Sequence, residues 1–436
     1  MGWGRTAPSV SRVIKPLDVA GIEAAVMSGS AVIARGLGRS YGDAAQNAGG
    51  AVLDLATLNS IAWGEAGIVT VGAGLCLRDL INDAVPRGWF VPVTPGTSWV
   101  TIGGAIAADV HGKNHHRDGS FGAHVLRIGI VDGRGDRLDL TPSDERFWAT
   151  IGGMGLTGII IDATVQMIPI PGRHMTVSTR RTADFDSTVE ALMSADSARY
   201  SVAWLDSLAT GAACGRGIVT FGEHSSDAGA GKGDAVAAPR ISAPEIFPDQ
   251  LLNRRTVAAF NSLWFRLAPS HRDGQRQSLA EFFHPLDAVA HWNRVYGTRG
   301  FLQYQCVVPA GELEILRRIF TRFVDAQVPS FLTVLKRFGA ASNAPLSFPI
   351  PGWTLTLDIP TDVPGLPAIL AAADDLVTHA GGRLYLAKDS RMPARLMPLM
   401  YPRLGQWQAI RDAMDPNGVF TSDLGSRLGL LRPGRG

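Results

Sequence analysis

Apolar and polar positions form different patterns in the two halves of the chain. In the first half, runs of β-forming residues predict strands at residues 31–36, 51–55 and 68–75, and the run at 158–172 closes the first domain. Helical spacing of apolar residues predicts short helices over 17–28, capped by Asp18, and over 77–85. Residues 127–140 contain the turn DGRGD between two alternating runs, which is typical of a β-hairpin.

The second half alternates polar and apolar residues with a period of two. The polar or mixed faces fall at Gln303 and Gln305, at Lys336 and Phe338, and at Thr354, Thr356 and Asp358. Helical patterns follow at 312–326 and 366–380. We therefore expect an antiparallel sheet with these helices on one face. The other face either meets solvent or roofs a polar cavity, and a lysine flanked by phenylalanine near two glutamines favours the cavity.

The segment between these halves has no clear period. Residues 225–250 are rich in Gly, Ala, Ser and Pro, which indicates a long mobile loop, and we place that loop at about 225–275. Residues 251–269 carry basic and apolar side chains at helical spacing. They predict either an ordinary amphipathic helix that caps the second domain, or a lid or membrane-facing edge with exposed Leu, Trp and Phe.

Composition narrows the class of protein. The chain has 436 residues, 46% hydrophobic and 18% charged, which suits a globular protein of two or three domains. A net charge of +2 without a basic run does not indicate nucleic-acid binding. Three isolated cysteines, Cys76, Cys214 and Cys306, show no metal-ligand spacing, so we expect no metal site. No apolar run reaches the ~18 residues of a membrane span. The N-terminus lacks the apolar core of a secretory signal, and we expect a soluble chain that meets a membrane only peripherally.

Residues 94–158 are the richest in candidate chemistry. Thirteen glycines interrupt this stretch, and four cationic or imidazole side chains cluster within it at His111, Lys113, His115 and His116. Glycine lets a backbone approach a ligand closely, and successive N–H groups can cradle a pyrophosphate. No G-x-G-x-x-G in this stretch follows a strand, opens a helix and carries an acidic residue about 20 positions on, and G-x-x-x-x-G-K-[ST] is absent. A lone histidine is more often structural, but four such groups together suit an anionic ligand.

Several motifs carry a resemblance to a known family. They are GLGRSYGD (36–43), TIGGAIAADVHGKNHH (101–116), GGMGLTGII (152–160), FFHPLD (282–287), WNRVYG (292–297) and AKDSR (387–391). With them the chain resembles FAD-linked oxidases of the vanillyl-alcohol-oxidase type nearly end to end. The resemblance implies an α+β fold, with a two-part PCMH-type FAD-binding domain and a substrate domain whose antiparallel sheet is covered by helices. We expect the FAD-binding domain at 1–172, the substrate domain at 173–383, and a C-terminal segment, 384–436, that returns to the FAD-binding domain.

The resemblance implies which residues hold FAD. They are Gly36, Gly38, Arg39, Ser40, Tyr41, Gly42, Thr94, Gly96, Thr97, Gly103, Gly104, Ala108, His111, Gly112, Asn114, His115, Gly153, Gly155, Gly158, Ile160 and Lys388. Covalent members of the family often have a histidine where this chain has Tyr41. Tyrosine cannot form that histidyl link, so we expect FAD to be bound non-covalently.

The resemblance also implies the catalytic and substrate-side residues. Lys388 and His111 are the expected catalytic residues, with Lys388 nearest the reacting carbon. The expected substrate-binding residues are Lys113, His284, Gln303, Gln305, Lys336, Phe338, Thr354 and Thr356. The chain departs from the family pattern at Thr354 and Thr356, where Asn and a nitroaromatic-trapping Cys are usual, and at Phe283, where Tyr is common. These departures bear on substrate and inhibitor preference rather than on fold or cofactor.

Within the family, the resemblance is greatest to oxidases of polyprenyl-phosphate-linked ribose. It implies oxidation of the 2′-hydroxyl of decaprenylphosphoryl-β-D-ribose to a 2′-keto group, the first half of an epimerisation for cell-wall arabinan synthesis. The implied partners are an NADH-dependent keto-reductase subunit and a quinone or oxygen as electron acceptor. The implied location is the periplasmic side of the cell envelope as a peripheral membrane protein, although without a visible signal peptide the cytoplasmic face stays open. The alternatives are an oxidase of a soluble sugar, alditol or aldonolactone, and a non-catalytic protein of the same fold.

Overall fold

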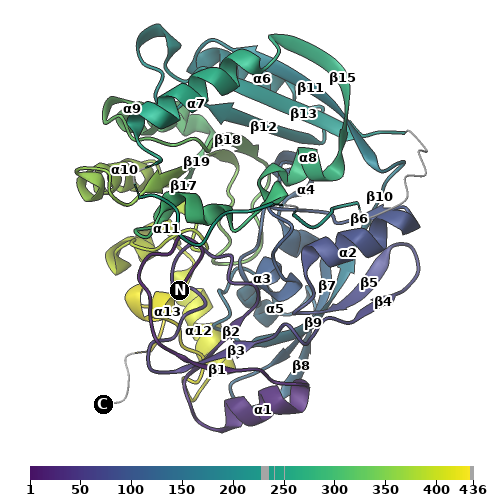
Figure 1. Ribbon diagram of the computed structural model, residues 1–436. Coiled ribbons are helices and arrows are strands. Elements are labelled where there is room, and N and C mark those ends of the chain that lie inside the picture. Colours follow the sequence, from purple (N-terminus) through teal and green to yellow (C-terminus); the bar gives the residue numbers. More distant parts are fainter. Residues whose placement is uncertain (227–234, 240, 250, 433–436) are drawn as a thin grey trace.

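Two small sheets form the lower half of the molecule in Figure 1, where the chain begins. The computed structural model describes residues 1–226, 235–239, 241–249 and 251–432. A parallel three-stranded sheet has the order β1 (Arg12–Ile14), β3 (Ala51–Asp54), β2 (Val32–Arg35). A five-stranded antiparallel sheet has the order β4 (Ile61–Trp63), β5 (Ile68–Gly72), β9 (Ile159–Gln166), β7 (Val125–Val131), β8 (Arg137–Leu140).

Short helices and turns connect these strands. The helices are α1 (Val19–Met27), α2 (Leu77–Ala84), α3 (Ile102–Ala107), α4 (His115–Asp118) and α5 (Glu145–Thr150), and a strand pair joins β6 (Trp89–Phe90) to β10 (Ile168–Pro169). The predicted cap of α1 is confirmed, because the Asp18 carboxylate accepts a hydrogen bond from the Gly21 N–H at 2.9 Å. The predicted hairpin is also confirmed, since β7 and β8 pair antiparallel across the turn at residues 132–136.

One large antiparallel sheet forms the upper half of the molecule in Figure 1. Its order is β15 (His271–Ser278), β11 (His174–Thr182), β13 (Gly217–His224), β12 (Tyr200–Leu205), β18 (Thr333–Phe338), β19 (Gly352–Pro360), β17 (Phe301–Pro309), β20 (Arg383–Leu384). Two further strands, β14 (Ile241–Ser242) and β16 (Val289–Ala290), pair with each other in parallel. The predicted α+β class is therefore confirmed.

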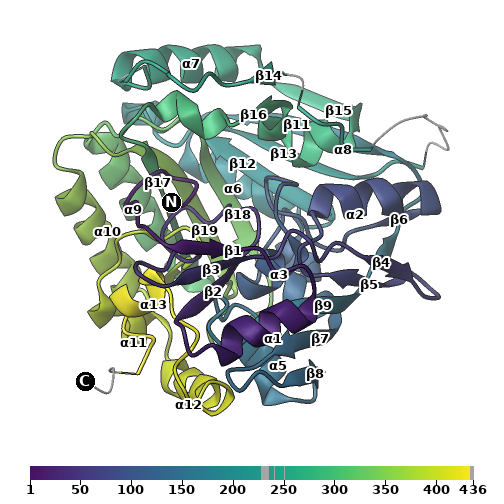
Figure 2. The ribbon, with the colours of Figure 1, turned by 60° about the horizontal axis from the view of Figure 1, so that its bottom comes forward.

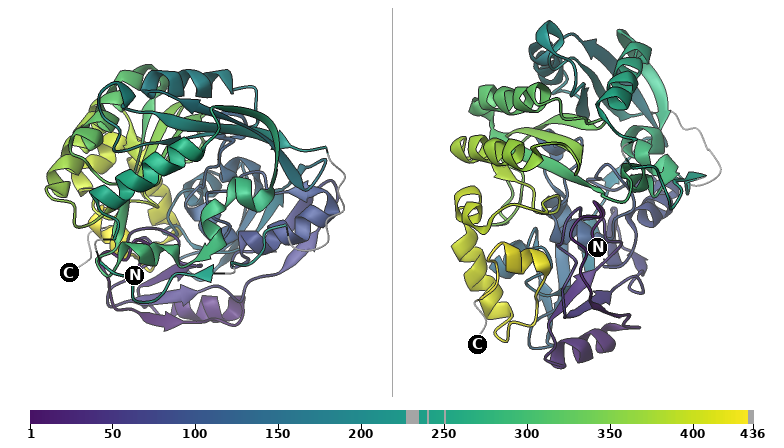
Figure 3. Two further views of the ribbon diagram at one scale, coloured as in Figure 1. Left: turned by 45° about the horizontal axis from the view of Figure 1, so that its top comes forward. Right: turned by 60° about the vertical axis from the view of Figure 1, so that its left-hand side comes forward.

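Helices cover one face of this sheet, as the alternating pattern predicts. α9 (Leu313–Asp325) and α10 (Leu366–His379) lie side by side against it (Figure 3, right). The rings of Tyr304 on β17 and Phe323 on α9 are 5.2 Å apart, and both residues are buried. The remaining helices of this part are α6 (Phe185–Ser194), α7 (Arg254–Leu267) and α8 (Leu279–Phe283). The opposite face of β17, β18 and β19 is left for the cavity described below.

The predicted loop at about 225–275 is wrong in its second half. Residues 254–267 form helix α7, and the residues from His271 onward belong to strand β15, the edge of the large sheet. The helix forms because Asn253 caps it by accepting from the Arg255 and Thr256 N–H groups. Part of the expected loop, residues 227–234, 240 and 250, lies outside the described residues.

The C-terminal segment contacts the first half of the chain. Its helices are α11 (Met397–Met400), α12 (Leu404–Met414) and α13 (Asp423–Arg427), and in Figure 2 α13 lies near β2 and β3. The Trp407 indole on α12 donates to the Ala149 carbonyl on α5 at 2.9 Å. The Val32 N–H donates to the Val419 carbonyl at 2.8 Å. These contacts fit a segment that returns to the FAD-binding domain, while the exact boundaries at residues 172 and 383 stay a proposal.

Candidate active site

A cavity of about 480 Å³ lies between the glycine-rich loops of the first half and the large sheet. Most of the residues that the sequence predicts for the site line it. From the first half these are Gly36, Gly38, Arg39, Ser40, Tyr41, Thr94, Gly96, Thr97, Gly103, Gly104, Ala108, His111, Gly112, Lys113, Gly155, Gly158 and Ile160. From the second half they are Gln303, Gln305, Lys336, Thr356 and Lys388. The sequence left two possibilities for this face of the sheet, solvent or a cavity, and the structure shows the cavity.

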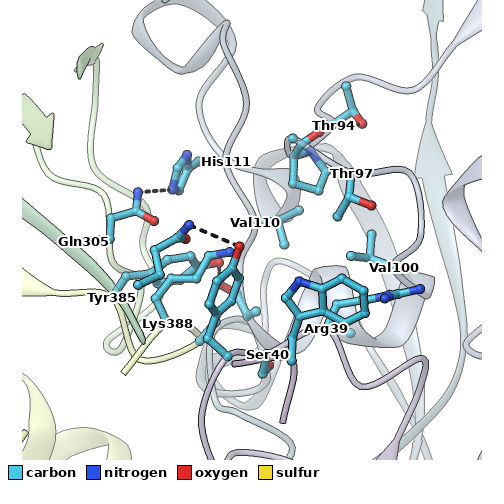
Figure 4. A pocket seen from close by; sticks show the side chains of 18 of the residues that line it. Arg39, Ser40, Thr94, Thr97, Val100, Val110, His111, Gln305, Tyr385 and Lys388 are labelled. Atoms are coloured by element: carbon cyan, nitrogen blue, oxygen red, sulfur yellow. Dashed lines mark hydrogen bonds between the residues drawn. The ribbon is translucent and has the colours of Figure 1, made fainter. Parts of the chain in front are cut away.

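The two sides of the cavity differ in chemistry. Figure 4 shows Arg39, Thr94 and Thr97 on one side, and Gln305, Tyr385 and Lys388 on the other. The first side consists largely of backbone and small side chains, because glycines allow the chain to bend and approach. Gly38 has φ of +63°, a left-handed conformation that favours glycine. Long polar side chains from β17, β18 and the 384–391 segment form the second side.

His111 lies at the centre of the second side. Its Nε2 is 2.9 Å from the Gln305 amide nitrogen, and its Nδ1 is 3.1 Å from the Lys336 amine. Burial is the main cause that holds the His111 pKa well below its usual range. The ring is therefore neutral near pH 7, with one donor nitrogen and one acceptor nitrogen.

The contacts around His111 indicate which nitrogen carries the proton. The Gln305 amide nitrogen also lies 3.3 Å from the hydroxyl of Thr354, which itself donates to the Cys306 carbonyl at 2.8 Å. With this amide orientation Gln305 donates to His111 Nε2, so Nδ1 carries the proton and donates to an uncharged Lys336 amine. Burial lowers the pKa of Lys336 to about 7, which allows that uncharged form.

Of the three lysines that line the cavity, Lys388 has the fewest hydrogen-bond partners among the described residues. Its amine lies 4.0 Å from the centroid of the Tyr41 ring, and among the described residues it has no hydrogen bond or ion pair. Burial lowers its pKa, while the negative charge of Asp358 acts in the opposite direction. The backbone N–H of Lys388 donates to the Tyr385 carbonyl at 2.9 Å, which fixes the segment that carries it. The result is an amine that faces the cavity with donor and acceptor capacity available.

Lys113 lies at the edge of the cavity. Its amine donates to the Phe282 carbonyl and lies 4.2 Å from the centroid of the Phe282 ring. Burial lowers its pKa to about 7. Lys113 and Lys336 therefore offer two amines whose positive charge would be strengthened by an incoming anion, because a nearby negative charge favours the protonated form.

Seven predicted residues do not line the cavity. They are Gly42, Asn114, His115, Gly153, His284, Phe338 and Thr354. His284 lies behind the wall, where its Nε2 is 2.8 Å from the hydroxyl of Thr94. Asn114 donates to the Pro92 carbonyl at 2.8 Å, and His115 Nδ1 accepts from the Gly339 N–H at 3.2 Å. These side chains support the loops rather than face a ligand.

Phe338 and Gly42 show the same supporting arrangement. The Phe338 ring packs against the His111 ring, with centroids 4.8 Å apart, and against His115. At Gly42 a Cβ atom would lie 2.0 Å from the Asp389 carbonyl oxygen, so the glycine allows the first loop to touch the segment that carries Lys388. Both residues hold cavity residues in place from outside the cavity.

Sequence reasoning missed three residues at or beside the site. Asp358 is fully buried on β19, where one carboxylate oxygen accepts from Gln303 and the other has no partner in the described residues. Its signal was an acidic residue at the end of the alternating strand 353–360. Tyr385 lines the cavity and donates to the Ala108 carbonyl at 2.8 Å. Asp287, the last residue of FFHPLD, accepts from the Thr97 hydroxyl at 2.6 Å and from the Ser98 N–H at 2.7 Å.

The residues present fit a flavin dinucleotide and do not fit a metal. No group of three or more His, Cys, Asp or Glu side chains within the described ranges could hold a metal ion. The cavity instead combines four glycine-containing loops, centred near residues 38, 96, 112 and 155, with the Lys388 amine on the facing wall, which has no hydrogen bond within the described part of the chain. Backbone N–H groups and glycines suit a pyrophosphate, and a cation beside the reactive ring suits a reduced flavin anion.

Comparison with known proteins agrees with this assignment. Residues 13–141 match an FAD binding domain family, and residues 310–428 match the D-arabinono-1,4-lactone oxidase family. The chain is 43% identical over 455 residues to the decaprenylphosphoryl-beta-D-ribose oxidase of Mycolicibacterium smegmatis, covering 99% of this chain and 97% of that protein. It is 38% identical to an uncharacterized protein in the mprA 5′ region of Streptomyces coelicolor, covering 82% of this chain and all of that protein.

A more distant relative marks the part shared across the wider group. Cytokinin dehydrogenase 2 of Arabidopsis thaliana is 27% identical over 150 residues, covering 33% of this chain and 29% of that protein. The near-complete match with the mycobacterial oxidase, by contrast, includes both walls of the cavity. This chain therefore belongs to the family of FAD-linked oxidases that contains decaprenylphosphoryl-β-D-ribose oxidase, and it is an FAD-dependent oxidoreductase.

Proposed function

We propose that this oxidase acts on decaprenylphosphoryl-β-D-ribose and converts its 2′-hydroxyl to a 2′-keto group, the first half of an epimerisation to the arabinose form for cell-wall arabinan. FAD, when bound, supplies the acceptor for the hydride that leaves C2′. The observation that carries the proposal is the amine of Lys388, which faces the cavity opposite the glycine loops and has no hydrogen-bond partner among the described residues. The identity across 99% of the chain to an oxidase named for this substrate supports it.

In this mechanism Lys388 takes the proton of the 2′-hydroxyl. The O–H bond breaks, the proton passes to the uncharged amine, and the oxygen becomes the carbonyl oxygen of the product. Burial of Lys388 favours the uncharged amine before the reaction. The resulting ammonium can then lie against the Tyr41 ring, where a cation is stabilised by about 0.5–2 kcal/mol.

Other side chains of the sheet would orient the sugar and its phosphate. Neutral His111 and Gln305 offer hydrogen bonds at the back of the cavity, and Lys336 or Lys113 would meet the phosphate. Binding of a phosphate would favour the protonated form of either lysine, and a substrate without that charge would lack this interaction. Thr356 and Gln303 complete the predicted substrate wall.

The first-half loops would hold FAD without a covalent bond. Arg39 is fixed by its Nε–H donation to the Trp99 carbonyl at 3.1 Å, and its guanidinium stacks on Trp3 at 4.0 Å. We assign the pyrophosphate to the backbone of the glycine loops, and the flavin edge to the region between His111 and Lys388. Tyr41 offers no nucleophilic imidazole for a covalent link.

The proposal includes partners and a location. The 2′-keto product needs a separate NADH-dependent keto-reductase to complete the epimerisation, and a quinone or oxygen must reoxidise the cofactor. The lipid substrate would require the protein to work peripherally at a membrane of the cell envelope, with the periplasmic side expected from the family. No helix in the described part of the chain is long and apolar enough to cross a membrane.

A second candidate is oxidation of a soluble sugar, alditol or aldonolactone. The match of residues 310–428 to the D-arabinono-1,4-lactone oxidase family favours it. The two candidates differ in the charge of the substrate, because a polyol or lactone has no phosphate for Lys113 and Lys336.

Anaerobic bleaching of the flavin separates these candidates. The FAD-loaded protein is mixed with farnesylphosphoryl ribose, or with polyols and aldonolactones, and the visible flavin band is followed. We expect bleaching by the prenyl-phosphate ribose alone. Bleaching by the soluble compounds without a response to the prenyl-phosphate ribose would favour the second candidate. A purified, folded protein that takes up no FAD would contradict both.

A further inference from the structure

Helix α7 directs its large apolar side chains away from the protein. Phe260, Leu263, Trp264 and Leu267 recur at i, i+3, i+4 and i+7 and so share one face. Their side chains are 45%, 58%, 51% and 72% exposed, respectively. A surface helix of a globular protein normally turns such a stripe toward the core. These four residues define the outward face of α7, which is an exposed apolar patch of the kind that marks an interaction surface.

Polar contacts fix this orientation of α7. The buried residues of the helix are Val257 and Asn261. The Asn261 amide donates to the Asp206 carboxylate at 2.9 Å and to the Ser330 carbonyl at 3.3 Å. A roll of the helix that buried the apolar stripe would break these buried hydrogen bonds, which costs about 1–3 kcal/mol for each group left unpaired. The hydrogen bonds of Asn261 on the buried side of α7 therefore keep the apolar face exposed.

The charge around the outward face is strongly positive. Arg254, Arg255 and Arg266 on the helix are exposed. Over residues 251–276 the chain has five arginines and one acidic residue, Asp273. An exposed apolar stripe bordered by arginines on one helix is the arrangement of helices that lie in the interface of an anionic bilayer. α7 also runs along the outer edge of the molecule, where a flat surface can reach it (Figure 2).

The outward face is continuous with the cavity. Trp264 belongs to both, since it lines the cavity and is half exposed. The cavity lining also includes the apolar side chains of Trp204 on β12 and Val334 on β18. An apolar chain could therefore leave the cavity past Trp264 and reach the outward face.

We propose that the outward face of α7 is a docking surface for an anionic lipid bilayer, and that the cavity opens beside Trp264 toward that bilayer. Phe260, Leu263 and Leu267 enter the interfacial region of the lipid, and the arginines contact the anionic headgroups. The second part of the proposal rests on the proposed function, because only a substrate with a polyprenyl chain needs an apolar route from the membrane. The first part holds for any substrate.

Vesicle co-sedimentation of the FAD-loaded full chain tests the docking surface. Vesicles of phosphatidylcholine alone are compared with vesicles that also contain phosphatidylglycerol, without substrate. We expect binding to the anionic vesicles that weakens with added salt. The double variant Leu263→Asp/Leu267→Asp should bind at least about a hundredfold more weakly, roughly tenfold for each leucine that no longer enters the lipid. The double variant Arg255→Gln/Arg266→Gln should weaken binding to the anionic vesicles specifically.

A matched control separates this surface from general hydrophobicity. Leu399 on α11 is 60% exposed, and Leu399→Asp should leave vesicle binding unchanged. Retained flavin absorption and bleaching by farnesylphosphoryl ribose would show that the α7 variants are folded. Equal sedimentation of the wild type and the leucine variant, or no binding of the wild type to anionic vesicles, would overturn the proposal. So would a leucine variant that loses only self-association in solution, because the face would then belong to a second copy of the chain.

Failure of docking and failure of the proposed function give different results. Absent vesicle binding with intact flavin bleaching by farnesylphosphoryl ribose would refute docking alone. Intact vesicle binding without bleaching would refute the substrate and, with it, the apolar route through Trp264.

Discussion

The amine of Lys388 lies 4.0 Å from the centre of the Tyr41 ring, although the two residues belong to motifs at opposite ends of the chain. The Tyr41 hydroxyl accepts a hydrogen bond from the Gln303 amide at 3.1 Å, and the same amide donates to Asp358. One cofactor loop, two neighbouring strands of the large sheet and the C-terminal segment therefore meet around Lys388 and Asp358. This junction is the part of the site on which the proposed chemistry depends.

Replacement of Lys388 tests the proton-accepting role directly. Lys388→Ala should retain FAD, because the glycine loops provide most of the cofactor cradle, but should lose flavin reduction by substrate by a factor of about 10²–10⁴. Stopped-flow absorption under anaerobic conditions measures that reduction. Lys15→Ala, which changes an exposed lysine beside Asp54, is the control and should behave as the wild type. Single-turnover reduction at the wild-type rate in Lys388→Ala would remove Lys388 from the mechanism.

The charge of Asp358 should set the pH at which Lys388 becomes active. The Asp358 carboxylate raises the pKa of Lys388, so its removal in Asp358→Asn lowers that pKa. Because the uncharged amine is the reactive form, the rise of the reduction rate with pH should shift to lower pH in the variant. The pH profile of flavin reduction measures the shift, and Asp79→Asn, at an exposed position, is the control. An unchanged inflection would show that Asp358 does not act through Lys388.

The sequence alone predicts the glycine loops and the lysines of the site, but it does not predict the role of Asp358. Glycine loops and lysines have distinctive local patterns, and most of those predicted residues line the cavity. Asp358 closes an alternating strand, so its sequence does not distinguish a buried carboxylate from a solvated one. Burial of both faces of β19 and the register that pairs Asp358 with Gln303 supply the missing information.

The prediction of His284 as a substrate residue shows a second limit of sequence reasoning. A resemblance places a residue near a site but does not say whether it contacts the ligand or the wall behind it. Here the Thr94 side chain lies between His284 and the cavity. The predicted loop over 225–275 extends too far because the sequence of its last part does not show which strand it pairs with. Strand β15 is mostly polar and exposed, so it becomes a strand by pairing with β11 rather than by its own pattern.

The cofactor should be released when the protein is unfolded. Tyr41 stands where covalent members of the family often have histidine. Its ring contacts the Lys388 amine, and its hydroxyl accepts a hydrogen bond from Gln303. Acid precipitation should therefore leave a colourless pellet and a yellow supernatant. The absorption of the two fractions measures this, with a covalent flavoprotein treated in parallel as the control. A yellow pellet after washing would mean that another residue of the chain binds the flavin covalently.

Thr356 should make the protein resistant to covalent trapping by activated nitroaromatic inhibitors. It lines the cavity beside Gln305, its partner on the neighbouring strand, but a threonine hydroxyl is a far weaker nucleophile than a cysteine thiolate. Mass spectrometry of protein incubated with such a compound and substrate should find no adduct at this position. Thr356→Cys is the matched variant and should gain the adduct. An adduct mapped to Thr356 in the wild type would contradict the prediction, and a Thr356→Cys variant without one would show that the wall is differently shaped.

Arg427 should hold the C-terminal segment and both active-site motifs together. Its guanidinium donates at 2.8 Å to Asp43, which ends the first cofactor loop, and at 2.8 Å to Asp389, the neighbour of Lys388. Both carboxylates are largely buried. Arg427→Ala would leave two buried negative charges without their partner, and breaking a buried pair in this way costs about 3–5 kcal/mol. We therefore expect a lower Tm and weaker retention of FAD, measured by thermal unfolding and by flavin fluorescence after gel filtration. Arg432→Ala removes a more exposed arginine that pairs with Asp412 and should change neither quantity. Equal Tm and FAD retention in the two variants would show that the junction is held by the apolar packing of α13 instead.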